Sequence, residues 1–192
     1  MKPATVVHRR HVLRSCARAA ALAVPGWVAL TSPARAAVPA GERTLALRHL
    51  HTQEHLQLVY AEADTYLAPA LQTLNHFLRD HYTGDVGVMD PQLFDLLHRV
   101  QVALGGRSVG QAPYEVISGY RCPATNSHLQ QTRGGGVASR SLHMDGRAID
   151  LRLPGVPLAE LRDAAHALKA GGVGYYPREG FVHLDTGRTR HW

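Results

Sequence analysis

Apolar and polar residues along the chain alternate with two different periods, and each period predicts a type of element. Alternation with period two from Thr44 to Leu50, resumed from His55 to Tyr60, predicts a two-stranded β-hairpin. Short apolar stretches bounded by turn residues predict four further strands. These strands are expected at Tyr114 to Ser118, Ala148 to Leu153, Val173 to Tyr176 and Phe181 to Asp185.

Apolar residues recur at helical spacing in three longer stretches. The first runs from Leu67 to Leu78, and the third runs from Leu158 to Leu168. The second opens at Asp90-Pro91, an N-cap residue followed by proline at the first helical position. A short helix is also expected around Ala124 to Gln131. These elements predict an α+β fold, in which helices pack on a small antiparallel β-sheet, as one domain over residues 44–192 after a linker at 37–43.

Charge is distributed unevenly between the first 36 residues and the remainder. The whole chain has 21 Lys and Arg against 15 Asp and Glu, a formal net charge of +6. Residues 1–36 contain six of these basic residues and no acidic one, so residues 37–192 are formally neutral. The basic character therefore belongs to the N-terminal segment, and the sequence gives no support for a nucleic-acid partner.

Residues 1–36 have the parts of an export signal peptide. A basic start is followed by an apolar run from Ala19 to Leu30 and by Ala34-Arg35-Ala36, an A-x-A cleavage pattern. The pair Arg9-Arg10 favours the twin-arginine route, which exports folded proteins, over an ordinary secretory signal. The apolar run is too short for a permanent membrane span, and it is interrupted by Pro25-Gly26. We expect a periplasmic protein in a bacterium with an outer membrane.

The stretch from Ser139 to Leu153 carries the strongest indication of chemistry. His143 and Asp150 stand seven residues apart across the turn signal Asp145-Gly146, so that the histidine can lie opposite the aspartate on the strand that follows. His183, on the predicted last strand, is the best candidate for a third ligand. Two histidines and a carboxylate with an open fourth position are a ligand set suited to catalytic zinc, and they would also accept manganese or cobalt.

Two other groups of residues allow a weaker metal hypothesis. His49, His51 and His55 lie in the predicted hairpin, where two of them share a face, although surface histidines are the simpler explanation. Cys122 is the only cysteine after residue 36, so residues 37–192 have no internal disulfide. A free, partly buried thiol is the simpler interpretation of Cys122, and a zinc ligand is the alternative.

Several motifs in order resemble one superfamily of zinc peptidases. S-x-H-x-x-G-x-A-x-D (Ser141 to Asp150), followed later by F-V-H-x-D (Phe181 to Asp185), is similar to the metal signature of lysostaphin-type peptidases, D-alanyl-D-alanine metallopeptidases and hedgehog signalling domains. S-G-Y-R-x-P-x-x-N (Ser118 to Asn126), G-V-G-Y-Y-P and the terminal R-H-W resemble more closely the bacterial group typified by murein endopeptidase K. The resemblance covers about Thr44 to Trp192.

The resemblance implies a hedgehog and D-Ala-D-Ala-peptidase-like fold and one zinc ion per chain. His143, Asp150 and His183 would hold the zinc, and Arg121 would pair with a carboxylate of the peptidoglycan stem peptides. Ser118 and Ser141 would orient these ligands and Arg121 without binding the metal themselves.

The general base is the part that the resemblance does not supply. Related dipeptidases carry a glutamate three residues before the last zinc histidine, where this chain has Gly180. We rank His191 and Asp185 equally as candidates, and Glu179 third because it would lie on the opposite face of a regular strand.

Three functions remain open from sequence. The leading one is a zinc endopeptidase that cuts cross-links, either 4-to-3 or 3-to-3, between stem peptides. A D-amino-acid carboxypeptidase on the same stems would need the same residues, and a non-catalytic zinc-containing peptidoglycan-binding protein is the competing class.

Overall fold

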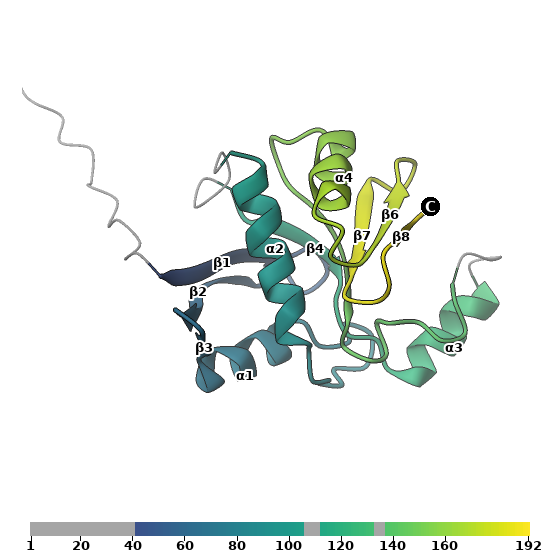
Figure 1. Cartoon of the computed structure of the whole chain (residues 1–192). Coiled ribbons are helices and arrows are strands. Elements are labelled where there is room, and N and C mark those ends of the chain that lie inside the picture. The colour runs from purple at the N-terminus through teal and green to yellow at the C-terminus, as the bar shows by residue number, and fades with distance from the viewer. Residues whose placement is uncertain (1–40, 106–111, 133–136) are drawn as a thin grey trace, which may run out of the picture. The chain divides into compact units, whose positions relative to one another are not determined.

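The computed structural model describes residues 41–105, 112–132 and 137–192, all within one compact unit (Figure 1). The predicted signal peptide at 1–36 and most of the predicted linker lie outside the described residues. The first strand begins at Glu42, so it includes the last two residues of that predicted linker.

Strands from both halves of the chain form one eight-stranded sheet in the order β3-β2-β1-β4-β5-β7-β6-β8. The strands are β1 (Glu42–His49), β2 (His55–Glu62), β3 (Thr65–Tyr66), β4 (Tyr114–Ser118), β5 (Ala148–Arg152), β6 (Gly172–Tyr176), β7 (Phe181–Asp185) and β8 (Arg190–His191). The predicted hairpin is present as the antiparallel pair β1 and β2. The four strands predicted after it are also present.

The α+β class is confirmed, but the expectation of a small antiparallel sheet is wrong. The sheet is mixed, because β1 pairs with β4 and β6 pairs with β8 in parallel. Between β1 and β4 the chain passes through β2, β3 and two helices, and so long a connection permits parallel pairing. Period-two patterns identify strands without identifying their neighbours, and β3 and β8 are too short to produce a pattern.

Four helices accompany the sheet, namely α1 (Ala68–Phe77), α2 (Pro91–Ala103), α3 (Pro123–Thr132) and α4 (Leu158–Ala167). Helix α2 contacts β1 and α4, and α4 contacts β6 and β7 (Figure 1). The sheet side chains beneath these helices are fully buried and apolar, as at Leu47, Val116, Leu151 and Leu184. The opposite face of β5 and β7 is free of this core and carries polar residues.

The start of α2 is fixed by the predicted N-cap. Asp90 Oδ1 accepts a hydrogen bond from the backbone N–H of Gln92 at 3.0 Å, and Pro91 occupies the first helical position. The backbone N–H of Asp90 donates to the carbonyl of Gly146 at 2.9 Å. The beginning of α2 is therefore attached to the turn that precedes β5.

In the part of the chain that the structure describes, none of the helices is both long enough and apolar enough to cross a membrane.

Candidate metal centre

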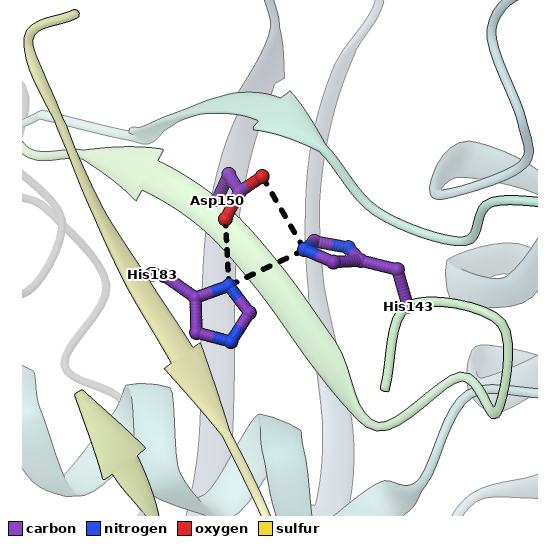
Figure 2. A group of neighbouring side chains, drawn as sticks. All are labelled: His143, Asp150 and His183. Carbon is purple, nitrogen blue, oxygen red and sulfur yellow. Dashed lines mark hydrogen bonds and ion pairs between the residues drawn. The ribbon is translucent and has the colours of Figure 1, made fainter. Parts of the chain in front are cut away.

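Three polar side chains converge on the face of β5 and β7 that lies opposite the helices. Asp150 on β5 and His183 on β7 are direct cross-strand partners, and His183 Nδ1 lies 2.8 Å from Asp150 Oδ1. His143, from the turn before β5, places Nε2 at 3.3 Å from both His183 Nδ1 and Asp150 Oδ2. Figure 2 shows the three side chains pointing toward one another. Among the described residues, this is the only such group of three His, Cys, Asp or Glu side chains.

The turn that carries His143 depends on a glycine. Residues 142–146 form consecutive turns, closed by hydrogen bonds such as Arg147 N–H to the Leu142 carbonyl at 2.9 Å. Gly146 has φ +65°, and a Cβ atom there would lie 2.0 Å from the Val88 carbonyl oxygen. A side chain at this position would both strain the backbone and push the turn away from the segment before α2. Gly146 therefore allows His143 to approach Asp150.

The second nitrogen of each imidazole has a hydrogen-bond acceptor. His143 Nδ1 lies 2.7 Å from the Gly119 carbonyl oxygen, and His183 Nε2 lies 3.1 Å from Asp185 Oδ2. A carbonyl and a carboxylate accept hydrogen bonds, so these two nitrogens are placed to donate to them. The other two nitrogens, His143 Nε2 and His183 Nδ1, face the centre of the group, where each would be a metal ligand in its unprotonated form. Metal-binding histidines in proteins are oriented by such partners.

The electrostatics of the group favour a charged carboxylate beside a basic imidazole. Burial lowers the pKa of His143, and the nearby Asp150 only partly opposes this effect. Burial would raise the pKa of Asp150, but His143 and His183 outweigh it and hold this pKa far below its usual range. Burial also lowers the pKa of His183, whereas hydrogen bonds to Asp150 and Asp185 raise it, with a net result of about 9.

The donor set fits a divalent metal ion. Two imidazole nitrogens and one carboxylate oxygen lie within 4.8 Å of one another, all on buried residues. The second nitrogen of each imidazole is directed outward, to Gly119 for His143 and to Asp185 for His183. Three protein ligands that leave a position open toward a cleft are typical of catalytic rather than structural zinc sites.

A cleft of about 620 Å³ lies over this group. His143, Asp150 and His183 form part of its lining, together with Arg121 and Ser141. Arg121 Nη2 lies 3.6 Å from Asp150 Oδ2 and donates to Ser118 Oγ at 3.3 Å. The structure thus brings Arg121 and Ser118 to the candidate ligands, and it places Ser141 at the start of the His143 turn, where its carbonyl accepts from Met144 N–H at 2.9 Å.

Asp185, one of the two first-ranked candidates for general base, lies behind His183 and not in the cleft. Its carboxylate is completely buried and accepts hydrogen bonds from His183 Nε2, from both terminal nitrogens of Arg190 and from the N–H groups of Gly172 and Gly187. Burial would raise the pKa of Asp185, but the hydrogen bonds from His183 and Arg190 hold it well below its usual range. A carboxylate held in this way is suited to orienting His183.

His191, the other first-ranked candidate, is not brought to the ligands. In the parallel pairing of β6 with β8, His191 is the partner of Val173, so its side chain lies on the helix face of the sheet. Its ring packs edge-on against His166 of α4, with ring centroids 4.8 Å apart. His191 is absent from the cleft lining.

Glu179, ranked third from sequence, does line the cleft. The argument against it assumed a regular strand, but residues 177–180 form a turn and β7 begins only at Phe181. Gly180 has φ +77°, so the alternation of faces does not extend back to Glu179.

The weaker metal hypotheses find no support in the described residues. His49 is fully buried, and its Nδ1 accepts from the backbone N–H groups of His51 and Thr52 at 3.2 and 3.4 Å. Cys122 is a free, buried thiol whose sulfur lies 3.5 Å from Thr125 Oγ1. Neither residue belongs to a convergent ligand group.

Sequence reasoning missed three parts of the site. The Gly119 carbonyl is a backbone group and gives no residue-specific signal. Arg190 was identified only within the terminal motif, yet its guanidinium binds Asp185 at 2.7 and 3.0 Å. Tyr176 and Trp192, which also line the cleft, were assigned to strand and terminus without a role.

Comparison with known proteins gives one consistent family. Residues 37–192 match the family model described as peptidoglycan L,D-endopeptidase MepK. The chain is 42% identical to the peptidoglycan L,D-endopeptidase MepK of Escherichia coli strain K12 over 174 residues, which are 91% of this chain and 89% of that protein. It is 41% identical to a protein of Haemophilus influenzae named probable peptidoglycan L,D-endopeptidase MepK, over 78% of each chain.

Proposed function

We propose that this chain, which belongs to the family of the peptidoglycan L,D-endopeptidase MepK, is a zinc-dependent endopeptidase that hydrolyses L,D cross-links between peptidoglycan stem peptides. The observation that carries the proposal is the convergence of His143, Asp150 and His183 at the floor of an open cleft. The family supports the substrate, and the ligand set supports the metal.

The three ligands would hold one zinc ion, with an open position toward the cleft. Bound there, zinc would act as a Lewis acid on the scissile carbonyl and on the attacking water. The Gly119 carbonyl fixes the ring of His143, and the Asp185 carboxylate fixes the ring of His183. Both contacts orient the imidazoles so that the ligand nitrogen of each would face the ion.

Glu179 is our candidate for the general base that takes the proton from the attacking water. Of the three sequence candidates, it alone lines the cleft. Asp185 is saturated with hydrogen-bond donors behind His183, and His191 lies on the helix face of the sheet. A residue can act as base only if it can reach the water, and this criterion selects Glu179.

Arg121 is our candidate for binding a carboxylate of the substrate. Its side chain lines the cleft beside Asp150, and Ser118 Oγ and Asn126 Oδ1 accept hydrogen bonds from its guanidinium at 3.3 and 3.4 Å. These contacts hold the planar guanidinium at the edge of the metal centre, where it can present paired donors to a stem carboxylate.

The test is incubation of residues 37–192, zinc-loaded, with purified cross-linked muropeptides, followed by mass spectrometry. We expect conversion of 3-to-3 linked dimers to monomers and loss of that conversion when a chelator is added. Removal of only a terminal residue would instead identify a carboxypeptidase. Dimers that survive while the protein retains one zinc per chain would favour a binding function over an enzyme.

We further propose that residues 1–36 direct export to the periplasm by the twin-arginine route. The supporting observations are the basic start with Arg9-Arg10, the short apolar run and the A-x-A pattern. Replacement of both arginines by lysine should prevent appearance of the processed protein in the periplasmic fraction. N-terminal sequencing of that protein should begin at Ala37.

A further inference from the structure

The cleft over the metal centre has two chemically different sides. Its lining crosses the sheet from Arg121 after β4, through Asp150 and His183, to Tyr176 on β6 and Trp192 after β8. The lining also includes the cationic residue Arg140, from the segment before His143. The side near β6 and β8 carries three aromatic residues, Tyr176, Phe181 and Trp192, which we call the aromatic wall. Glu179 and Arg190 also line the cleft there, and the Arg190 guanidinium is paired with the buried carboxylate of Asp185.

The aromatic wall is held in a fixed geometry. The rings of Tyr176 and Phe181 stack with their centroids 4.6 Å apart, and Trp192 Nε1–H donates to the Tyr176 hydroxyl at 2.7 Å. The backbone of Trp192 is paired with β6, because Tyr175 N–H donates to the Trp192 carbonyl at 3.0 Å. A Cβ atom at Gly174 would lie 2.8 Å from the indole, so the indole fits there only because this residue is a glycine.

Trp192 remains 49% exposed although it is anchored at both its backbone and its indole nitrogen. Its ring centroid lies 5.3 Å from that of His183, so the exposed indole borders the candidate metal position. A rigid, half-exposed tryptophan with its polar nitrogen already satisfied offers apolar area at little entropic cost, which is the property of anchor residues in binding sites.

We propose that the aromatic wall is a substrate subsite that binds the aliphatic side chain of the stem residue next to the scissile bond. The inference rests on the proposed endopeptidase function and adds the orientation of the substrate in the cleft. Stem carboxylates lie on the β4 side, near Arg121, and the methylene chain of the cross-linking diamino acid lies on the β6 and β8 side. Burial of methylene groups against aromatic rings supplies the affinity.

Distance favours the peptide over the glycan as the occupant of the wall. In a 3-to-3 cross-link the scissile bond lies at the third residue of a stem, and an extended chain of three residues places the sugar about 10 Å away. Trp192 lies directly beside the ligand His183. The wall therefore contacts residues adjoining the scissile bond, whereas a sugar ring would lie beyond it.

The kinetic test compares 3-to-3 linked dimers with and without their disaccharides, using zinc-loaded residues 37–192. For Trp192→Ala we expect KM to rise about tenfold on both dimers, with kcat within about twofold of wild type. Trp192→Phe should recover most of this loss. Tyr82→Ala, which removes an exposed aromatic residue outside the cleft lining, is the matched control.

Three kinetic results would overturn the proposal. These are an unchanged KM for Trp192→Ala, a rise in KM confined to the sugar-bearing dimer, and a loss of activity that follows a loss of zinc affinity in both Trp192 variants. The second result would assign the wall to the glycan. The third would show that Trp192 only supports His183.

A second measurement separates the wall from the endopeptidase function itself. Trp192 is the only tryptophan in residues 37–192, so its fluorescence reports on the wall alone. The sugar-free dimer added to chelator-treated protein, which cannot hydrolyse it, should shift the emission to shorter wavelength with saturation, and the free disaccharide should not. If the wild-type protein cleaves none of the dimers but this emission shift occurs, the endopeptidase proposal fails, whereas the proposal that the aromatic wall binds the stem peptide is retained. If the emission wavelength of Trp192 does not change at a saturating concentration of the dimer, the proposed subsite is refuted.

Discussion

Replacement of Asp185 by asparagine distinguishes the two chemical roles that this residue could have. The sequence makes Asp185 a candidate general base, whereas the structure places it behind His183, with its carboxylate buried and surrounded by donors. Oδ1 accepts from Gly172 N–H, Gly187 N–H and one nitrogen of Arg190. Oδ2 accepts from His183 Nε2 and the other nitrogen of Arg190.

An asparagine can keep an oxygen on only one of these two sides. The side with three donors should retain it, so the amide NH₂ would face His183 Nε2. His183 would then favour the tautomer protonated at Nδ1, the nitrogen that faces Asp150 and the candidate metal position. Loss of such a supporting contact weakens metal binding by about 10- to 100-fold, or about 1.4 to 2.7 kcal/mol.

The assay is zinc affinity by competition with a chelator at constant pH, followed by hydrolysis of cross-linked dimers at saturating zinc. We expect Asp185→Asn to lose affinity by the amount given and to regain most of its hydrolysis when zinc is saturating. Asp163→Asn, an exposed aspartate paired with Arg162, is the matched control. Unchanged zinc affinity together with hydrolysis lowered about 10²- to 10⁴-fold would refute the reasoning and identify Asp185 as the base.

Four further substitutions give three independent tests. Glu179→Gln should lower kcat about 10²- to 10⁴-fold with unchanged zinc content, while His191→Gln should change it less than about twofold, both measured on the same dimer. Arg121→Lys should raise KM about tenfold in the same assay, because lysine loses the bidentate fork, and an unchanged KM would remove Arg121 from substrate binding. Burial, with the nearby His81 and His51, lowers the pKa of His49 from 6.5 to about 4. Between these two pH values the unfolded chain binds a proton at His49 and the folded protein does not. The free energy of unfolding therefore decreases as the pH falls from 6.5 toward 4. Urea unfolding at several pH values should show that the difference in free energy of unfolding between wild type and His49→Asn decreases by up to about 3 kcal/mol as the pH falls across that interval. A difference that does not change with pH would contradict this.

Sequence patterns predicted most elements of the fold because their signals are local. The leucine spacing of α1, the Asp90-Pro91 start of α2 and the alternation in the β1 and β2 hairpin depend only on neighbouring residues. The parallel pairing of β1 with β4 depends on packing between distant segments, and no period in the sequence encodes it. This explains why the sheet was expected to be antiparallel.

The same distinction applies within the site. The turn between His143 and Asp150 was predicted because Gly146 and the strand that follows are close in sequence. The side of the sheet on which His191 lies is set by the pairing of β8 with β6. Because β8 has only two residues, it produces no alternating pattern in the sequence. Glu179 was ranked low because β7 was extended backward through a segment that is a turn.

The place of Trp192 beside the cleft has a practical consequence for handling the protein. Its backbone is hydrogen-bonded to β6, and its indole borders the candidate metal position. Any residues attached after Trp192, such as a purification tag, would therefore leave from the rim of the cleft. A polyhistidine tag placed there would compete for metal ions with the candidate ligands His143, Asp150 and His183. A tag on the N-terminal side of β1 would enter the fold at the opposite half of the sheet, away from these ligands.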